Sequence, residues 1–248
     1  PVFSEDKPLY VFASHSHGDH FNPEIFRLTK QYPQVHFVLS HDIWMTRKKH
    51  TRAGVAESNF EQAVYMRAHE TKEFSAITVT TLRSTDMGVA FLVKYGDLKI
   101  YHAGDLHWWL WPGDTKQAAG NMTANYQREI GHLRELLSPQ SSSSTAKSST
   151  VQKSRSDALQ PQLDLAFLPL DGRLEENYAL GITYFLQQIS VRHVFPMHFW
   201  EDYEVVERYA ATLPQNDPNP CAGDTAFFPI LHKISQPGQS WFLSEILS

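Results

Sequence analysis

Short apolar runs alternate along the chain with segments whose apolar residues recur at helical spacing. The apolar runs have the length and composition of buried strands, and they lie at residues 9–12, 35–39, 77–82, 89–93, 98–102, 163–168 and 191–195. Among the later runs, apolar positions fall on one helical face in 178–189 and 203–209. Because strands and helices are mixed in one chain, the sequence predicts an α/β fold in which helices cover sheets.

One polar segment interrupts this pattern. Residues 138–161 read SPQSSSSTAKSSTVQKSRSDALQP, with Val151 and Leu159 as the large apolar side chains. Such a segment buries too little apolar surface to offset the entropy lost on ordering it, so we expect a mobile surface insertion. A chain of 248 residues is long enough for one large domain. We therefore expect residues 1–248 to form a single domain that carries this insertion.

The composition is that of a globular protein, with 42% hydrophobic and 20% charged residues. The sequence has no apolar run of 18 residues and no charged leader followed by an apolar stretch, so we expect neither a membrane span nor a signal peptide. Cys221 is the single cysteine, which excludes an internal disulfide and a cysteine-type zinc site. A reducing, cytoplasmic location is the resulting expectation.

The charge gives no general attraction to nucleic acid. The formal net charge is -5 at pH 7, whereas binding to a phosphate backbone needs a basic surface. The one basic run, Arg47-Lys48-Lys49-His50 with Arg52, is typical of a solvated helix face.

The most informative stretch follows the first apolar run. It reads ASHSHGDHF at 13–21 and contains the pattern His15-x-His17-x-Asp19-His20. Chance alone gives about 0.002 matches to four such fixed positions in a chain of this length and composition. A strand that ends just before the pattern delivers these side chains into a loop, where they can converge. Neutral imidazoles and a carboxylate are ligands of Zn²⁺, and also of Mn or Fe, so the pattern predicts a metal site.

Two other strand ends carry residues of the same types. Asp105 follows the strand at 98–102, and His198 follows the strand at 191–195. Directly after the histidine pattern, Asn22-Pro23-Glu24 has the composition of a helix cap and first turn. These positions predict that several strand ends supply ligands to the same site.

The order of these residues resembles the metallo-beta-lactamase fold superfamily, in which a Gly-Asp after a strand and a histidine after a late strand follow His-x-His-x-Asp-His. The segments YHAGD at 101–105 and FPMHF at 195–199 are similar to the branch containing the ascorbate-6-phosphate lactonase-like metal-dependent hydrolases. The resemblance covers residues 9–205 apart from the Ser-rich insertion. It implies an αββα sandwich with metals at one edge between two sheets.

Carried over residue by residue, the resemblance implies a site for two metal ions. The ligands implied are His15 and His17 for the first ion, Asp19, His20 and His198 for the second, and Asp105 as the bridge. A water or hydroxide between the ions would be the nucleophile, and Asp19 would also orient it or carry its proton. The expected cofactor is Zn²⁺, as one or two ions, with Mn or Fe as alternatives.

Two features depart from the superfamily pattern. Members normally supply a third histidine to the first metal, but the corresponding segment TLRSTDMGVAF offers Ser84, Thr85 and Asp86 instead. We expect Asp86 or water to complete this ligand set and the first ion to bind more weakly than the second. Members also place further strands before the histidine pattern, whereas 14 residues precede His15 here. The resemblance therefore implies that those strands come from upstream of Pro1 or that one sheet is truncated.

Three side chains are candidate substrate contacts. Trp108 belongs to a cluster with Trp109 and Trp111, which forms either an aromatic wall beside the metals or ordinary core. His102 either touches the substrate or packs behind a metal ligand. Arg173 suits a carboxylate or phosphate group, or it forms a structural salt bridge.

These residues predict a hydrolase that cleaves an ester, lactone or phosphoester bond of a small polar molecule. One alternative is a nucleic-acid phosphodiesterase, since some members of the superfamily cleave RNA, but such an enzyme needs several Lys and Arg contacts to phosphates. Another alternative is a non-catalytic metal-binding or ligand-binding protein, which the missing third histidine would allow. The sequence leaves the oligomeric state open.

Overall fold

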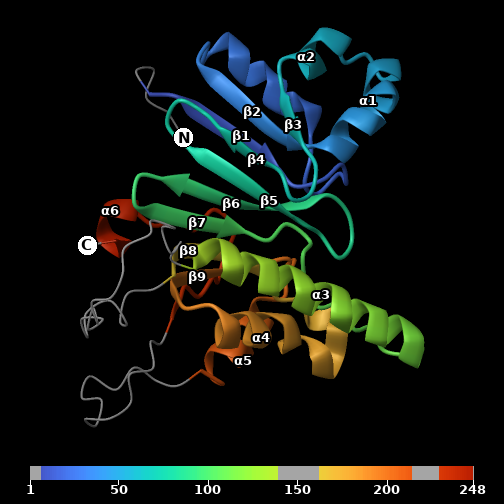
Figure 1. The fold of residues 1–248 in the computed structure, drawn as a ribbon, viewed down its shortest axis with the longest axis vertical. Helices are drawn as coiled ribbons and strands as arrows, with labels where there is room; N and C mark the ends of the chain where they lie inside the picture. The colour runs from blue at the N-terminus through green and yellow to red at the C-terminus, as the bar shows by residue number, and fades with distance from the viewer. Residues whose placement is uncertain (1–6, 139–161, 214–228, 248) are drawn as a thin grey trace, which may run out of the picture. The chain divides into compact units, whose positions relative to one another are not determined.

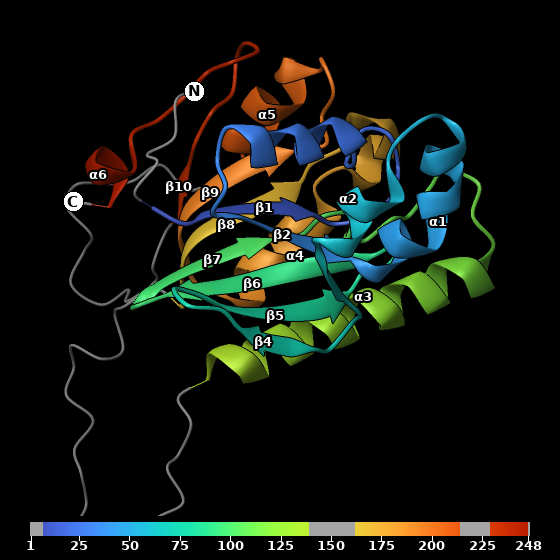
Figure 2. The same ribbon diagram turned by 90° about the horizontal axis from the view of Figure 1, so that it is seen from above.

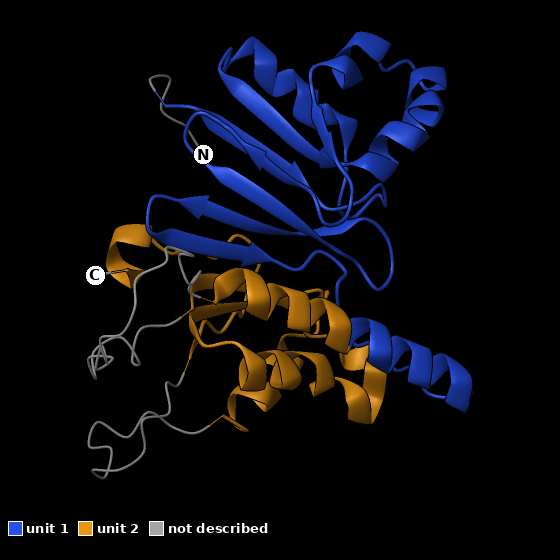
Figure 3. Cartoon of the chain, in the orientation of Figure 1, with its two compact units in different colours: residues 1–126 blue, residues 127–248 orange. Residues whose placement is uncertain are grey.

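The computed structural model describes residues 7–138, 162–213 and 229–247 of the chain (Figures 1 and 2). The chain divides into two compact units, residues 1–126 and 127–248 (Figure 3). Strands and helices are mixed in both units, which confirms the α/β class predicted from the sequence.

The first unit contains a parallel sheet of β1, β2 and β3 and an antiparallel sheet of β4 to β7. Its elements are β1 (Leu9–Ala13), the 3-10 helix η1 (Pro23–Lys30), β2 (Val35–Ser40), α1 (His41–Arg52), α2 (Glu57–Glu61), β3 (Val64–Met66), β4 (Thr71–Glu73), β5 (Thr78–Arg83), β6 (Val89–Tyr95), β7 (Leu98–His102) and the start of α3 (Lys116–Leu137), which runs into the second unit.

The two faces of β2 pack against different layers of the first unit, because successive side chains of a strand point to opposite sides. Phe37 and Leu39 join the apolar cluster that also holds side chains of η1, α1 and α2. Val38 packs instead with Val79 of β5 and Phe91 of β6. The unit is therefore ordered as helices, parallel sheet and antiparallel sheet (Figure 1). Each such buried side chain contributes about 1.5–3 kcal/mol to the free energy of unfolding.

The second unit is built on a parallel sheet in which β9 pairs with β8 on one side and with β10 on the other. Its own elements are β8 (Leu163–Pro169), the 3-10 helix η2 (Gly172–Asn177), α4 (Leu180–Gln188), β9 (Val191–Met197), α5 (Tyr203–Ala210), β10 (Ile230–Leu231) and α6 (Leu243–Ile246). The helical faces predicted from the sequence are buried at Ile182 and Phe185 on α4 and at Val205, Val206 and Tyr209 on α5.

The seven strands and two helices predicted from the sequence are all present, with ends shifted by at most two residues. The structure adds elements that we did not predict, above all the 22-residue helix α3. Its buried side chains Tyr126, Ile130, Leu133 and Leu137 recur every three or four residues, so its periodicity was present in the sequence. The short strands β3 and β4 have three residues each, too few for a periodic signal.

Several smaller predictions can also be compared with the structure. The Asn22 side chain accepts a hydrogen bond from the backbone N of Glu24, as expected of a cap. Lys48, Lys49 and Arg52 are exposed on α1, as expected of a solvated helix face, whereas Arg47 packs on Trp44 and His50 packs on Phe21 and Phe60. In the described part of the chain, no helix has the length and apolar content needed to cross a bilayer. Residues 139–161 of the Ser-rich segment, and Cys221, lie outside the described residues.

Candidate metal centre

The histidine loop leaves the end of β1 and is held between the start of β6 and the end of β7. The backbone N of Val89 donates to the carbonyl oxygen of Ser14 at 3.0 Å. Gly88 has φ +74°, and a Cβ there would lie 2.0 Å from that same oxygen. Gly104 has φ +53°, and its Cβ would lie 2.6 Å from the Ser14 Cβ. The close approach that forms the site therefore requires glycine at both positions.

Three histidines of the loop gather around the carboxylate of Asp105. His15 is completely buried, and its Nε2 lies 3.3 Å from Asp105 Oδ2 and 3.0 Å from His17 Nδ1. His20 Nε2 lies 3.2 Å from the other carboxylate oxygen, Oδ1. Asp105 thus presents one oxygen to each of two imidazoles, as a bridging ligand would.

The donor set fits a divalent cation. One donor atom from each of His15, His20 and Asp105 lies within 4.8 Å of the other two, and the same holds for His15, His17 and Asp19. Burial, with the neighbouring His20 and His17, lowers the pKa of His15 to about 4, so its ring is neutral at pH 7. A neutral imidazole offers one nitrogen lone pair, which is the form that binds a metal.

Asp86 lies near His15 and His17, where this chain lacks the third histidine that the resemblance implies. One donor atom each of His17, Asp86 and Asp105 lies within 4.8 Å of the others. The backbone N of Asp86 donates to Ser84 Oγ at 3.2 Å, which helps to fix the turn between β5 and β6. The Asp86 side chain is exposed, so it can reach an ion without a large desolvation cost.

Two side chains that the sequence analysis did not identify form hydrogen bonds with the histidine loop. Ser14 Oγ lies 3.1 Å from His15 Nδ1 and 3.3 Å from His20 Nδ1. The backbone N of Ser16 donates to Asp42 Oδ2 at 2.8 Å. Asp42 follows β2, which runs parallel to β1 with Ala13 opposite Leu39. Polar residues at the carboxyl ends of neighbouring parallel strands were the signal that could have revealed Asp42.

His198 lies in the second unit, just beyond β9, with a left-handed φ of +66°. Its Nδ1 is 3.0 Å from Asp171 Oδ2. Arg173 also donates to Asp171, from Nε to Oδ1 at 2.9 Å and from a terminal nitrogen to Oδ2 at 2.6 Å. Burial raises the pKa of Asp171, but the hydrogen bonds from His198 and Arg173 outweigh it and hold that pKa well below its usual value. The convergence of His198 with the ligands of the first unit stays a prediction.

The candidate substrate contacts differ in exposure. Trp108 is 8% exposed, and its Nε1 donates to Thr123 Oγ1 at 3.1 Å, which favours the core interpretation. Trp111 is 40% exposed and stacks on Trp109. His102 Nδ1 accepts from the backbone N of Gly104 at 3.1 Å. Burial and the nearby His20 lower the pKa of His102 to about 4, so its ring is neutral.

The sequence matches no protein-family model, and no curated protein matches it. Among solved structures, the chain is similar to CmlA, a diiron beta-hydroxylase from Streptomyces venezuelae, with 11% identity and a TM-score of 0.46 over 78% of this chain and 36% of CmlA. It is also similar to the metallo-beta-lactamase fold protein YhfI from Bacillus subtilis, with 10% identity and a TM-score of 0.47 over 82% of this chain and 70% of YhfI.

A third similar structure is Zn²⁺-bound PqqB from Methylobacterium extorquens, with 13% identity and a TM-score of 0.41 over 77% of this chain and 59% of PqqB. The chain thus spans about a third of the length of CmlA. These similarities concern the path of the polypeptide chain. The functional conclusion therefore depends on the residues of the candidate metal centre.

Proposed function

We propose that the protein is a metal-dependent hydrolase that cleaves an ester, lactone or phosphoester bond of a small polar substrate. The observation that carries the proposal is the gathering of His15, His17 and His20 around the carboxylate of Asp105. A bound divalent cation supplies Lewis acidity, which polarises the scissile carbonyl or phosphoryl group. The imidazole and carboxylate donors suit Zn²⁺, with Mn or Fe as alternatives.

The residues divide into two ligand sets. We assign His15, His17 and Asp86 to one cation and Asp19 and His20 to the other, with Asp105 shared. We further propose that His198 completes the second set. The hydrogen bond between His198 Nδ1 and Asp171 supports this assignment, because metal-binding histidines commonly donate their second ring N–H to a carboxylate.

Asp19 is the proposed proton carrier of the site. Its side chain is 41% exposed, and its Oδ2 lies 3.5 Å from His20 Nε2, so the carboxylate stands between the ligands and solvent. Arg173 keeps 53% of its side chain exposed while it is paired with Asp171, so its guanidinium can meet an anionic group of the substrate. We also propose that the protein is cytoplasmic and that it is related to the ascorbate-6-phosphate lactonase-like hydrolases.

The test combines metal analysis with a substrate panel. Purified protein is analysed for bound metal and then assayed with RNA and with three small substrates, an activated ester, a lactone and a phosphodiester. We expect turnover of at least one small substrate, and we expect His17→Ala to lower both the metal content and the turnover. His36→Ala is the matched control, because His36 is an exposed histidine of β2 outside the candidate ligand sets.

Two outcomes would contradict the proposal. Bound metal without turnover of any substrate would favour the non-catalytic metal-binding protein. Turnover of RNA alone would favour the nucleic-acid phosphodiesterase, although the net charge of -5 disfavours it.

A further inference from the structure

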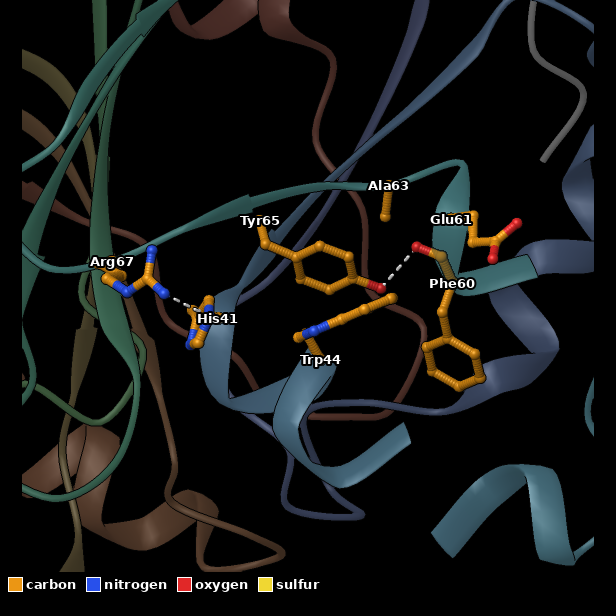
Figure 4. A pocket seen from close by; sticks show the side chains of 7 residues that line it. All are labelled: His41, Trp44, Phe60, Glu61, Ala63, Tyr65 and Arg67. Carbon is orange, nitrogen blue, oxygen red and sulfur yellow. Dashed lines mark hydrogen bonds between the residues drawn. The ribbon is translucent and has the colours of Figure 1, made fainter. Parts of the chain in front are cut away.

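The first unit contains a pocket that none of the proposed metal ligands lines. Its volume is about 400 Å³, within the range of small-molecule sites. It is formed by α1, α2 and the segment that carries β3, and the residues that line it are His41, Trp44, Phe60, Glu61, Ala63, Tyr65 and Arg67 (Figure 4).

The middle of the pocket is an aromatic wall whose rings are held in place. The rings of Trp44 and Tyr65 lie 5.3 Å apart between centroids, and the Phe60 side chain is fully buried. The Tyr65 hydroxyl donates to the carbonyl oxygen of Phe60 at 2.9 Å. The guanidinium of Arg47 lies 3.7 Å from the centroid of the Trp44 ring. A wall held in this way offers a preformed surface to a flat apolar group.

One end of the pocket carries hydrogen-bond donors and a positive charge. A terminal nitrogen of Arg67 lies 2.8 Å from His41 Nε2. Because a guanidinium can only donate, Nε2 of His41 is the acceptor and the ring proton is on Nδ1. Figure 4 shows the indole nitrogen of Trp44 at the end of its ring nearer to His41.

The Arg67 guanidinium forms no ion pair with a carboxylate within the described ranges. Glu70 accepts a hydrogen bond from the backbone N of Arg67 rather than from its guanidinium. Glu61 lies at the opposite end of the pocket (Figure 4). The pocket is therefore positive at one end, aromatic in the middle and negative at the other end.

We propose that this pocket binds a small aromatic monocarboxylate, with the carboxylate on Arg67 beside His41 and the ring against Trp44 and Tyr65. A guanidinium matches the two oxygens of a carboxylate in one plane. The negative charge of Glu61 at the far end disfavours a ligand with a second acidic group.

The test uses benzoate as the probe, with benzamide as its uncharged isostere, by isothermal titration of the full chain. We expect saturable binding of benzoate and binding of benzamide at least about tenfold weaker, because a charge-assisted hydrogen bond is lost. Arg67→Gln is expected to weaken benzoate binding by a similar factor. Arg27→Gln is the matched control, because Arg27 is an exposed arginine on η1 that pairs with Glu24.

A second pair of variants tests whether the aromatic wall contributes to benzoate binding and whether benzoate binds in this pocket. Trp44→Leu should weaken benzoate binding, whereas His17→Ala should leave it unchanged, because His17 belongs to the proposed metal site and not to the pocket. Equal binding of benzoate and benzamide by the wild-type protein, which needs no variant, would overturn the proposal. Loss of binding in His17→Ala together with retention in Arg67→Gln would also overturn it, since the carboxylate would then sit on the metal ligands.

Discussion

At the scale of single residues, the candidate metal centre depends on hydrogen bonds that neighbouring side chains form with the proposed ligands. Ser14 Oγ touches the Nδ1 atoms of both His15 and His20, and these contacts place the Nε2 atoms toward Asp105. A hydrogen bond to one ring nitrogen sets which nitrogen carries the proton, and hence which lone pair can bind a metal. A serine hydroxyl can donate or accept, so Ser14 orients both imidazoles and is compatible with a proton on each Nδ1, which leaves each Nε2 available to a metal.

Replacing Ser14 tests this orienting role. We expect Ser14→Ala to lower metal affinity by about 10-fold to 100-fold, the usual cost of losing a partner behind a ligand. The measurement is competition against a chromophoric chelator. Ser75→Ala is the control, because Ser75 is an exposed serine that bonds Tyr10 on the surface. An affinity as high as that of the wild type would show that packing alone orients the two imidazoles.

The two ligand sets should hold metal with unequal strength. We expect purified protein to retain one ion firmly and another weakly after dialysis against a mild chelator, as measured by mass spectrometry. His198→Ala should empty the tight site, whereas Asp86→Ala should lower the occupancy of the weak site alone. Asp97→Ala is the control, because Asp97 is exposed in the turn between β6 and β7. Two ions retained equally by the wild type and by Asp86→Ala would mean that another ligand completes the first set.

At the scale of elements, the end of β1 is locked by the neighbouring strands β6 and β7. The contact is a backbone hydrogen bond from Val89 to Ser14, with Gly88 and Gly104 leaving no room for a side chain. The geometry of the metal ligands thus depends on strand ends that are far apart in the sequence.

A methyl group at Gly88 should disturb this contact. Gly88→Ala places a Cβ where it would lie 2.0 Å from the Ser14 oxygen, so we expect a loss of about 1–3 kcal/mol from overpacking, in addition to the cost of φ +74°. Gly96→Ala is the matched control, since Gly96 also has a positive φ but open space around it. Urea unfolding of both variants separates the clash from the backbone effect. Equal destabilisation in the two variants would contradict the clash.

The pairing of β10 with β9 should depend on pH. His232 Nε2 lies 3.0 Å from His193 Nδ1, and the His232 ring stacks on Phe195. Burial, and then the neighbouring His193, lowers the pKa of His232 to about 4, and burial also lowers the pKa of His193. Because the unfolded chain binds more protons than the folded chain between pH 6.5 and 4, stability is retained above pH 6.5 and lost as the pH falls toward 4.

Hydrogen exchange at pH 7 and pH 5 measures this effect, after correction for the intrinsic pH dependence of exchange. We expect protection of the amides in 229–247 to fall at pH 5 and His232→Phe to remove most of that change. His132→Phe replaces an exposed histidine of α3 and is the control. Unchanged protection between the two pH values would show that the histidine pair does not hold this segment.

At the scale of the whole molecule, the proposed functional residues are distributed over both compact units. The proposed ligands of the histidine loop, Asp86 and Asp105 belong to residues 1–126, and His198 with Asp171 belongs to residues 127–248. The proposed second ligand set therefore includes residues of both units. Loss of the tightly bound metal in His198→Ala would support this assignment.

The Ser-rich segment belongs to the same scale. Its composition predicts that it adds little to the core, because surface loops can be shortened at small thermodynamic cost. We expect replacement of most of residues 138–161 by a short Gly-Ser linker to leave the melting temperature nearly unchanged. A large drop in the melting temperature would mean that the segment packs on one of the units.

The sequence was sufficient to identify the seven longer strands, the α/β class and the residues of the histidine loop, but not the short strands β3, β4 and β10. Strand and helix periods are local properties, so runs such as 35–39 and 163–168 were identified without tertiary information. The cluster of His15, His17, Asp19 and His20 was equally local, because four residues in one loop remain neighbours in any fold. The helix α3 was missed although its period was present.

The tertiary structure alone decided which distant side chains support that loop. The contact of Asp42 with Ser16 depends on the register of β1 with β2, and the position of Asp86 depends on the turn between β5 and β6. The aromatic pocket joins α1, α2 and β3, whose residues share no sequence pattern. A local pattern shows which face of an element is apolar, but the partner of that face is set by packing summed over the whole unit.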